Sequence, residues 1–273
     1  MAVKLHMNLE LAGKVAIVTG GDSGIGAAVC RMLAEEGVRV VIADRRDEKG
    51  TAAALAIQQR GGTGMFVRTD VSRRAEVNAL IATTLQAYGQ VDILCNIAGP
   101  GAQGGQLETT EAELDRQLNG HLKGVFHCTQ EVLPHMMQRR SGKIINMGSL
   151  TAYGATGDIP AYCAAFGGIL AYSKSVARFA AAYNINVNTV SPGTIATPMT
   201  AAWLSQPGVK EAVLRQIPLG RLGEPEDVAA VYVFLAGLRS STPSRRHRYH
   251  CQRWASALLT APHTTRLRRH VVW

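Results

Sequence analysis

A run of β-branched residues, Lys14 to Thr19, leads directly into the glycine-rich sequence TGGDSGIG at residues 19–26, which opens an amphipathic stretch. This succession restricts the fold more than any other feature of the chain. Glycines let a backbone turn tightly and approach a ligand, and the free N–H groups of a starting helix favour a negative charge. After a strand and before a helix, the motif predicts a pyrophosphate cradle; the alternative is a plain turn at a helix start.

Further short β-branched runs alternate with segments that have a helical apolar period. The runs expected as strands are Lys14 to Thr19, Val38 to Ala43, Gly64 to Arg68, Val91 to Cys95, Lys143 to Met147 and Ile185 to Val190. Repeated strand and helix units with right-handed crossovers form a doubly wound parallel sheet, with the ligand crevice at the carboxyl ends of its strands. We therefore expect a single α/β domain of Rossmann type over residues 1–238.

Asp44 lies eighteen residues beyond Gly26, at the expected end of the second strand. A carboxylate there accepts hydrogen bonds from the ribose hydroxyls of NAD and repels the 2′-phosphate of NADP. Arg45 and Arg46 follow, and guanidinium groups can hold that phosphate. Since the acid occupies the strand end, the sequence favours NAD over NADP.

Composition excludes several other classes of protein. The start of the chain, MAVKLHMNLELAGK, lacks the apolar core of a signal peptide, and the five cysteines are widely spaced without a CxxC pair. We expect a cytoplasmic protein with reduced thiols, with no metal site and no membrane partner.

The net charge of +9 comes almost entirely from the end of the chain. Residues 239–273 contain eight arginines and no acidic residue, so removing them leaves +1. We expect this tail to be poorly ordered. Trp254, Trp273 and Tyr249 lie among its arginines and are able to stack on bases, but the tail has no nucleic-acid-binding motif, so nucleic acid is not the expected partner.

Several motifs in order resemble those of the short-chain dehydrogenase/reductase family over residues 8–238. The resemblance implies that the cofactor is bound by residues at the ends of the first four strands. After the first strand these are Gly20, Asp22, Ser23, Gly24, Ile25 and Gly26; after the second, Asp44 and Arg45; after the third, Asp70 and Val71; and after the fourth, Asn96, Ala98 and Gly99, in a loop similar to NNAG. It adds Pro192, Gly193, Ile195 and Thr197 in PGTIAT, after the sixth strand.

The resemblance also implies the catalytic residues. Ser149 precedes Tyr162 by thirteen residues, the usual separation in the family, so Ser149 would orient a substrate oxygen and Tyr162 would exchange a proton with it. Two positions depart from the pattern. Phe166 stands where the family has Lys, and His121 stands where it has Asn. His121 either relays a proton through titration near neutrality or is a helix residue without a role.

These features imply an NAD-dependent oxidoreductase that interconverts a secondary alcohol and a ketone and is impaired by Phe166; the alternative is an NAD-binding pseudoenzyme. The substrate is a small molecule whose identity the sequence does not show.

Residues 196–216 are expected to form a lid with an apolar wall, or an ordinary packing helix. By resemblance, a homo-oligomer, dimer or tetramer, is expected. The family's seventh strand has no match in the tail, which is either a reading-frame change or a genuine extension.

Overall fold

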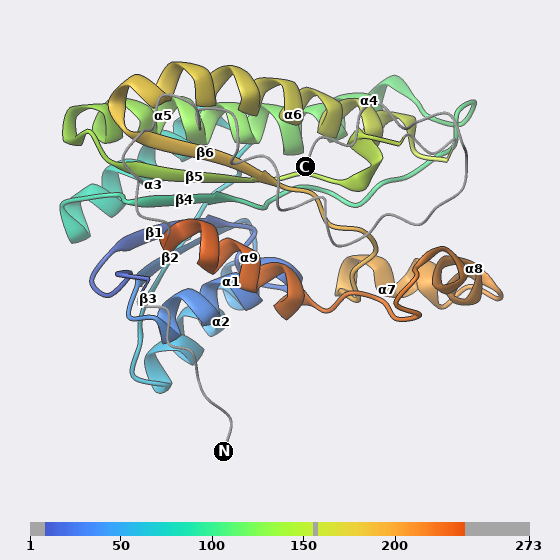
Figure 1. The fold of residues 1–273 in the computed structure, drawn as a ribbon, viewed down its shortest axis with the longest axis horizontal. Helices are drawn as coiled ribbons and strands as arrows, with labels where there is room; N and C mark the ends of the chain where they lie inside the picture. Colours follow the sequence, from blue (N-terminus) through green and yellow to red (C-terminus); the bar gives the residue numbers. More distant parts are fainter. Residues whose placement is uncertain (1–8, 155–157, 238–273) are drawn as a thin grey trace.

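A computed structural model describes residues 9–154 and 158–237 (Figure 1). Within them one six-stranded parallel sheet is covered by helices on both faces, which confirms the predicted doubly wound α/β fold. The strands are β1 (Val15–Thr19), β2 (Arg39–Asp44), β3 (Thr63–Arg68), β4 (Ile93–Asn96), β5 (Gly142–Met147) and β6 (Ile185–Val190). The α-helices are α1 (Gly24–Glu35), α2 (Asp47–Gln59), α3 (Arg74–Tyr88), α4 (Glu111–Gln117), α5 (Gly124–Arg139), α6 (Pro160–Ala180), α7 (Pro198–Leu204), α8 (Val209–Gln216) and α9 (Pro225–Gly237).

The strands lie in the order β3-β2-β1-β4-β5-β6. The chain builds outward from β1 to β3, then crosses back and builds in the other direction from β4. In such sheets the loops at the carboxyl ends of the two central strands diverge and leave a crevice for a ligand. The topology therefore places the site between the loops that follow β1 and β4.

Alternating side chains of the central strands form two cores. Ala16 and Val18 of β1 face the layer of α1, α2 and α9, whereas Val15 and Ile17 face α3, α5 and α6. All five residues of β1 are buried. A strand covered on both faces must be apolar on both, which explains its uninterrupted β-branched run.

The expected strand bounds differ from the observed ones by one or two residues. Asp44 is the last residue of β2 rather than the first residue after it, and β4 begins at Ile93 rather than Val91. The predicted domain limit at residue 238 and the predicted tail at 239–273 fall at or outside the end of the described residues, so both stay predictions.

Asp92, just before β4, contacts both a neighbouring strand and a helix. Its carboxylate is buried and accepts hydrogen bonds from Val15 N at 2.9 Å and Gln90 Nε2 at 2.8 Å, and it pairs with Arg139 of α5 at 3.0 Å. A buried carboxylate with three donors fixes β1, β4 and α5 relative to one another.

We predict that Asp92→Ala destabilises the fold by about 3 kcal/mol, because the buried N–H of Val15 and the Arg139 guanidinium lose their acceptor. Urea unfolding followed by circular dichroism measures the change. Glu35→Ala is the control, since it removes only an exposed pair with Arg31 and should change stability by less than about 0.5 kcal/mol. Equal losses for the two variants would contradict the role of Asp92.

Candidate functional site

The glycine-rich turn after β1 leaves no room for a side chain at Gly20, Gly21 or Gly26. Gly20 has a φ of +71° and Gly24 a φ of +52°, backbone conformations that favour glycine. A Cβ on Gly26 would lie 1.9 Å from the carbonyl oxygen of Gly20. The turn therefore requires glycine at these positions at the start of α1, with Ser23 and Ile25 between them, and its binding of a phosphate group stays a prediction.

The loop after β4 is fastened to the end of β1. The Thr19 hydroxyl accepts hydrogen bonds from Ile97 N at 3.0 Å and Ala98 N at 3.2 Å. A Cβ on Gly20 would lie 2.9 Å from Ala98 Cα, so the two loops are in close contact. Asn96 is buried and donates from Nδ2 to Asn146 Oδ1 at 2.8 Å. Two of the predicted cofactor segments are thereby brought together.

A cluster of charges occupies the end of β2. Arg46 forms an ion pair with Asp22 of the glycine-rich turn, donates to Ser23 Oγ at 3.0 Å and lies 3.5 Å from Asp44 Oδ1. Burial, and secondarily the neighbouring Asp22, raise the pKa of Asp44. Arg45, which the sequence favoured as a cofactor residue, contributes its backbone N–H to Asp44 Oδ1 at 2.7 Å. The guanidinium that neutralises both acids thus belongs to Arg46.

Asp70 and Val71 follow β3 at the start of a turn into α3. Although burial opposes the effect, hydrogen bonds from the Ser72 hydroxyl at 2.7 Å and N–H at 3.0 Å lower the pKa of Asp70. Val71 packs against Gly124, where a Cβ would lie 2.7 Å from Val71 Cγ2. Asp70 is therefore an anionic group at the same edge of the sheet as Asp44.

Ser149 and Tyr162 lie together, as their spacing predicts. The buried Ser149 hydroxyl accepts hydrogen bonds from the N–H of Thr151 at 3.2 Å and from its hydroxyl at 2.9 Å. Burial raises the pKa of Tyr162 to about 12, and a hydrogen bond with Ser149 opposes that rise. Tyr162 is therefore a neutral phenol near neutral pH.

Three rings, those of His121, Tyr162 and Phe166, form what we call the ring cluster. Their centroids are separated by 4.6 Å for His121 and Phe166, 4.4 Å for Tyr162 and Phe166, and 5.4 Å for His121 and Tyr162. His121 Nε2 lies 2.9 Å from the carbonyl oxygen of Pro100. Because a carbonyl only accepts, Nε2 carries the hydrogen.

The environment of His121 contradicts a relay that depends on titration near neutrality. Burial lowers the pKa of His121 to about 4; the Pro100 hydrogen bond opposes this shift and the positive charge of Arg116 adds to it. At neutral pH the ring is therefore uncharged. The relay hypothesis assumed the ordinary titration range of a histidine, whereas His121 is buried and only 5% exposed.

Sequence reasoning missed the backbone around His121. Residues Leu118–Lys123 form a π-helix between α4 and α5. Short π-helical segments inside longer helices occur often at functional sites. In the sequence, the feature that marks this segment is Gly120, inside an otherwise helical stretch. The structure shows that a Cβ on Gly120 would lie 2.5 Å from Pro100 Cδ. The wider helical turn presents His121 to Pro100 and to the ring cluster.

The segment after β6 closes the opposite side of the crevice. Leu150 N donates to Pro192 O at 3.2 Å, which joins this segment to the residue after Ser149. Ile195 forms a bridge with Gly223, and a Cβ on Gly24 would lie 3.4 Å from Thr197. Residues that the sequence predicts as one site, although widely separated along the chain, are thus connected by contacts.

The predicted lid consists of α7 and α8, which extend beyond the carboxyl ends of the strands (Figure 1). Met199 packs near Gly101, where a Cβ would lie 3.3 Å from Met199 Cγ. Met199 and Trp203 are 56% and 45% exposed, and the apolar wall stays a prediction.

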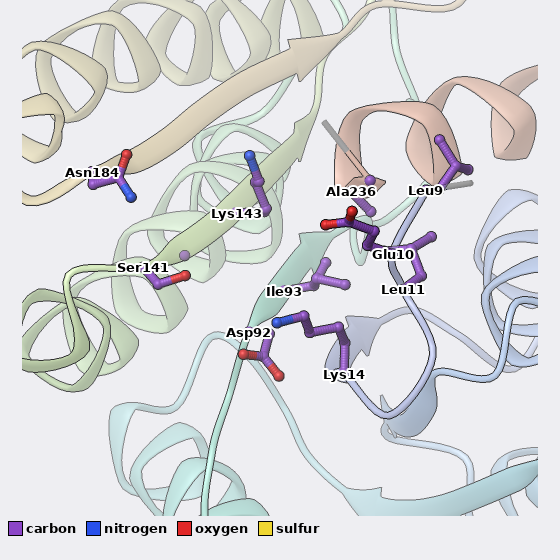
Figure 2. Close-up of a pocket in the computed structure, with 12 residues that line it drawn as sticks. Leu9, Glu10, Leu11, Lys14, Asp92, Ile93, Ser141, Lys143, Asn184 and Ala236 are labelled. Carbon is purple, nitrogen blue, oxygen red and sulfur yellow. The ribbon is translucent and has the colours of Figure 1, made fainter. Parts of the chain in front are cut away.

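The described part of the chain has a cavity at each end of the sheet. One, of about 160 Å³, borders Pro192 and Gly193, and its lining includes Leu150, Ile217 and Leu219 but none of the residues of α7 and α8. The other, of about 150 Å³, lies at the amino ends of β4 and β5, where Lys14, Lys143 and Asn184 point toward it (Figure 2). A doubly wound sheet binds its ligand at the carboxyl ends, so this second cavity is remote from the site.

Among the described residues no cluster of His, Cys, Asp or Glu has the arrangement of a metal site. Cys30, Cys95, Cys128 and Cys163 are free thiols. No helix in the described part of the chain is long and apolar enough to span a membrane.

Comparison with known proteins places the chain in a family. A family model described as Enoyl-(Acyl carrier protein) reductase matches residues 20–243. The 3-oxoacyl-[acyl-carrier-protein] reductase of Chlamydia pneumoniae is 37% identical over 86% of this chain and 94% of its own length. L-fucose dehydrogenase of Bos taurus is 39% identical over 85% of this chain and 86% of its own length.

Solved structures agree. The crystal structure of gox2181 superposes with a TM-score of 0.82 at 32% identity, covering 84% of this chain and 90% of that one. Actinorhodin polyketide ketoreductase with NADPH gives a TM-score of 0.78 at 30% identity, covering 83% and 93%. The fold is that of a doubly wound α/β protein. More specifically, the chain belongs to the short-chain dehydrogenase/reductase family, as its motifs predict.

We predict that the stability of the protein falls as the pH is lowered from about 6.5 to about 4, by up to about 3 kcal/mol from His121 alone. The pKa of His121 is about 4 in the folded protein and about 6.5 in the unfolded chain, so the unfolded chain binds the extra proton in this range. Urea unfolding of the protein and of His121→Asn at several pH values measures the contribution. An unchanged acid dependence in His121→Asn would contradict the prediction.

Proposed function

We propose that the protein is an NAD-dependent oxidoreductase that interconverts a secondary alcohol and a ketone, with Tyr162 as the proton donor and acceptor and Ser149 orienting the substrate oxygen. The observation that carries the proposal is the hydrogen bond between these two hydroxyls, beside a crevice whose glycine-rich turn has no space for side chains. When bound, the nicotinamide cofactor would supply or accept the hydride.

The chain's own groups support a role in proton transfer. During reduction of a ketone, the neutral Tyr162 phenol donates its proton to the substrate oxygen, while Ser149 donates a hydrogen bond to that oxygen and Thr151 holds the Ser149 hydroxyl in place. During oxidation Tyr162 must first lose its proton, which its raised pKa opposes. With Phe166 in place of the family's Lys, no ammonium at that position lowers this pKa.

NAD rather than NADP is proposed because of the acids at the end of β2. Asp44 and Asp22 occupy the region between the second strand and the glycine-rich turn, and Arg46 is already engaged by both. A 2′-phosphate would face two carboxylates and a guanidinium that is not free. The structure of actinorhodin polyketide ketoreductase, a relative of this chain, contains NADPH. A comparison of the two cofactors therefore tests the proposal directly.

We expect NAD to bind at least about tenfold more tightly than NADP, a difference of about 1.4 kcal/mol. Isothermal titration calorimetry with both cofactors tests this. Asp44→Ala should reduce the preference below tenfold, since it removes the ribose acceptor and one of the two carboxylates near Arg46. Asp47→Ala, which loses an exposed carboxylate 3.6 Å from Arg68, is the matched control and should leave the preference intact. Tighter binding of NADP would overturn the assignment.

Turnover of NADH with a panel of ketones tests the chemistry. We expect slow reduction, about 100-fold or more below that of a relative with Lys at this position, and a further loss of about 100-fold in Tyr162→Phe. Tyr153→Phe, which removes the hydroxyl of a tyrosine that is 58% exposed, is the control. Alcohol oxidation should accelerate up to the highest pH at which the fold survives, because the ionised fraction of Tyr162 grows about tenfold per pH unit.

NADH binding without turnover of any ketone would instead favour the alternative, a nucleotide-binding pseudoenzyme. We also propose that the substrate is a small molecule, which the ketone panel tests. We propose further that the protein is a homo-oligomer, and gel filtration with light scattering measures its mass.

A further inference from the structure

The two departures from the family's catalytic pattern contact each other. The His121 ring lies 4.6 Å from the Phe166 ring, and the two residues are 5% and 1% exposed. On its other side His121 fills the space above Gly99, where a Cβ would lie 1.9 Å from the ring. The imidazole is therefore enclosed between Phe166 and the loop after β4.

Both residues also contact Tyr162. Phe166 lies one helical turn after Tyr162 on α6, with ring centroids 4.4 Å apart, and His121 approaches the Tyr162 ring edge-on at 5.4 Å. Packed aromatic rings in such geometries fix one another's orientation. The position of the Tyr162 hydroxyl thus depends on both neighbours.

An ammonium at position 166 is disfavoured while His121 remains. The ring occupies the adjacent space, and its Nε2–H is already donated to Pro100 O. Its acceptor nitrogen, Nδ1, faces Gly99, where a Cβ would lie 2.0 Å from it. A lysine placed here would lose hydration, because Phe166 is only 1% exposed and lies among other buried rings. Asn at position 121 is smaller and offers an amide oxygen as an acceptor.

We infer that His121 and Phe166 are a matched pair of positioning residues for Tyr162, each accommodated because the other is present. The inference rests on the proposed role of Tyr162. It also implies that Phe166→Lys alone does not recreate the family's catalytic arrangement, because the imidazole excludes it.

The test is a double-mutant cycle of His121→Asn, Phe166→Lys and their combination in the full-length chain. Thermal unfolding is the first readout. Each single variant should lower Tm, and the double variant should melt at least about 3 °C above the sum of the single effects, because its amide oxygen accepts from the new ammonium.

The second readout is the titration of Tyr162, obtained as the difference in ultraviolet absorbance between each protein and its Tyr162→Phe counterpart. Phe166→Lys alone should leave the midpoint within about half a unit of the parent protein, and the double variant should lower it by about two units. NADH turnover by the double variant should exceed that by Phe166→Lys at least about tenfold.

Phe179→Lys is the matched control, since it places the same substitution on the exposed part of α6, where Phe179 is 55% exposed. Its effect on Tm should add to that of His121→Asn without coupling.

Additive effects on Tm in the main cycle, or a Tyr162 midpoint lowered as far by Phe166→Lys alone as by the double variant, would overturn the inference. If Tm and the midpoint behave as expected but none of the variants oxidises NADH, the pair stands and the proposed oxidoreductase function is wrong.

Discussion

The close approach of the loops after β1 and β4 is the constraint on which the site depends. Thr19 accepts two backbone N–H groups of the second loop, and Gly20 packs against Ala98 with no space for a side chain. This contact exists because the chain reverses its strand order between β1 and β4. Gly99, one residue further on, then contacts the His121 ring and so connects the proposed cofactor site with Tyr162.

Packing at the centre of the site has replaced charge. The buried Phe166 ring adds to the desolvation that raises the pKa of Tyr162 and carries no charge that would oppose it. The same burial holds His121 uncharged. The site thus keeps the position of its hydroxyls while losing the electrostatic means of ionising Tyr162, which is why proton donation is better supported than proton removal.

Near the end of β2, in contrast, the site keeps its charges, since two carboxylates lie beside one guanidinium. Arg46 lies between Asp22 and Asp44 and forms ion pairs with both. Burial, and secondarily the charge of Asp22, raise the pKa of Asp44, and the positive charge of Arg46 opposes that rise. Arg46 is therefore part of the cradle's own structure, and its engagement makes it a poor ligand for an additional phosphate.

The sequence by itself determined the order of strands and helices, the glycine-rich turn and the pairing of Ser149 with Tyr162, because strand runs, glycine positions and fixed spacings are local properties of the chain. It also identified Phe166 and His121 as departures. Only the tertiary structure decided that these two side chains touch, that Arg46 rather than Arg45 neutralises the acids, and that His121 lies in a π-helix with its titration far from neutrality. Burial and contacts between distant segments set those properties, and neither is encoded in local spacing.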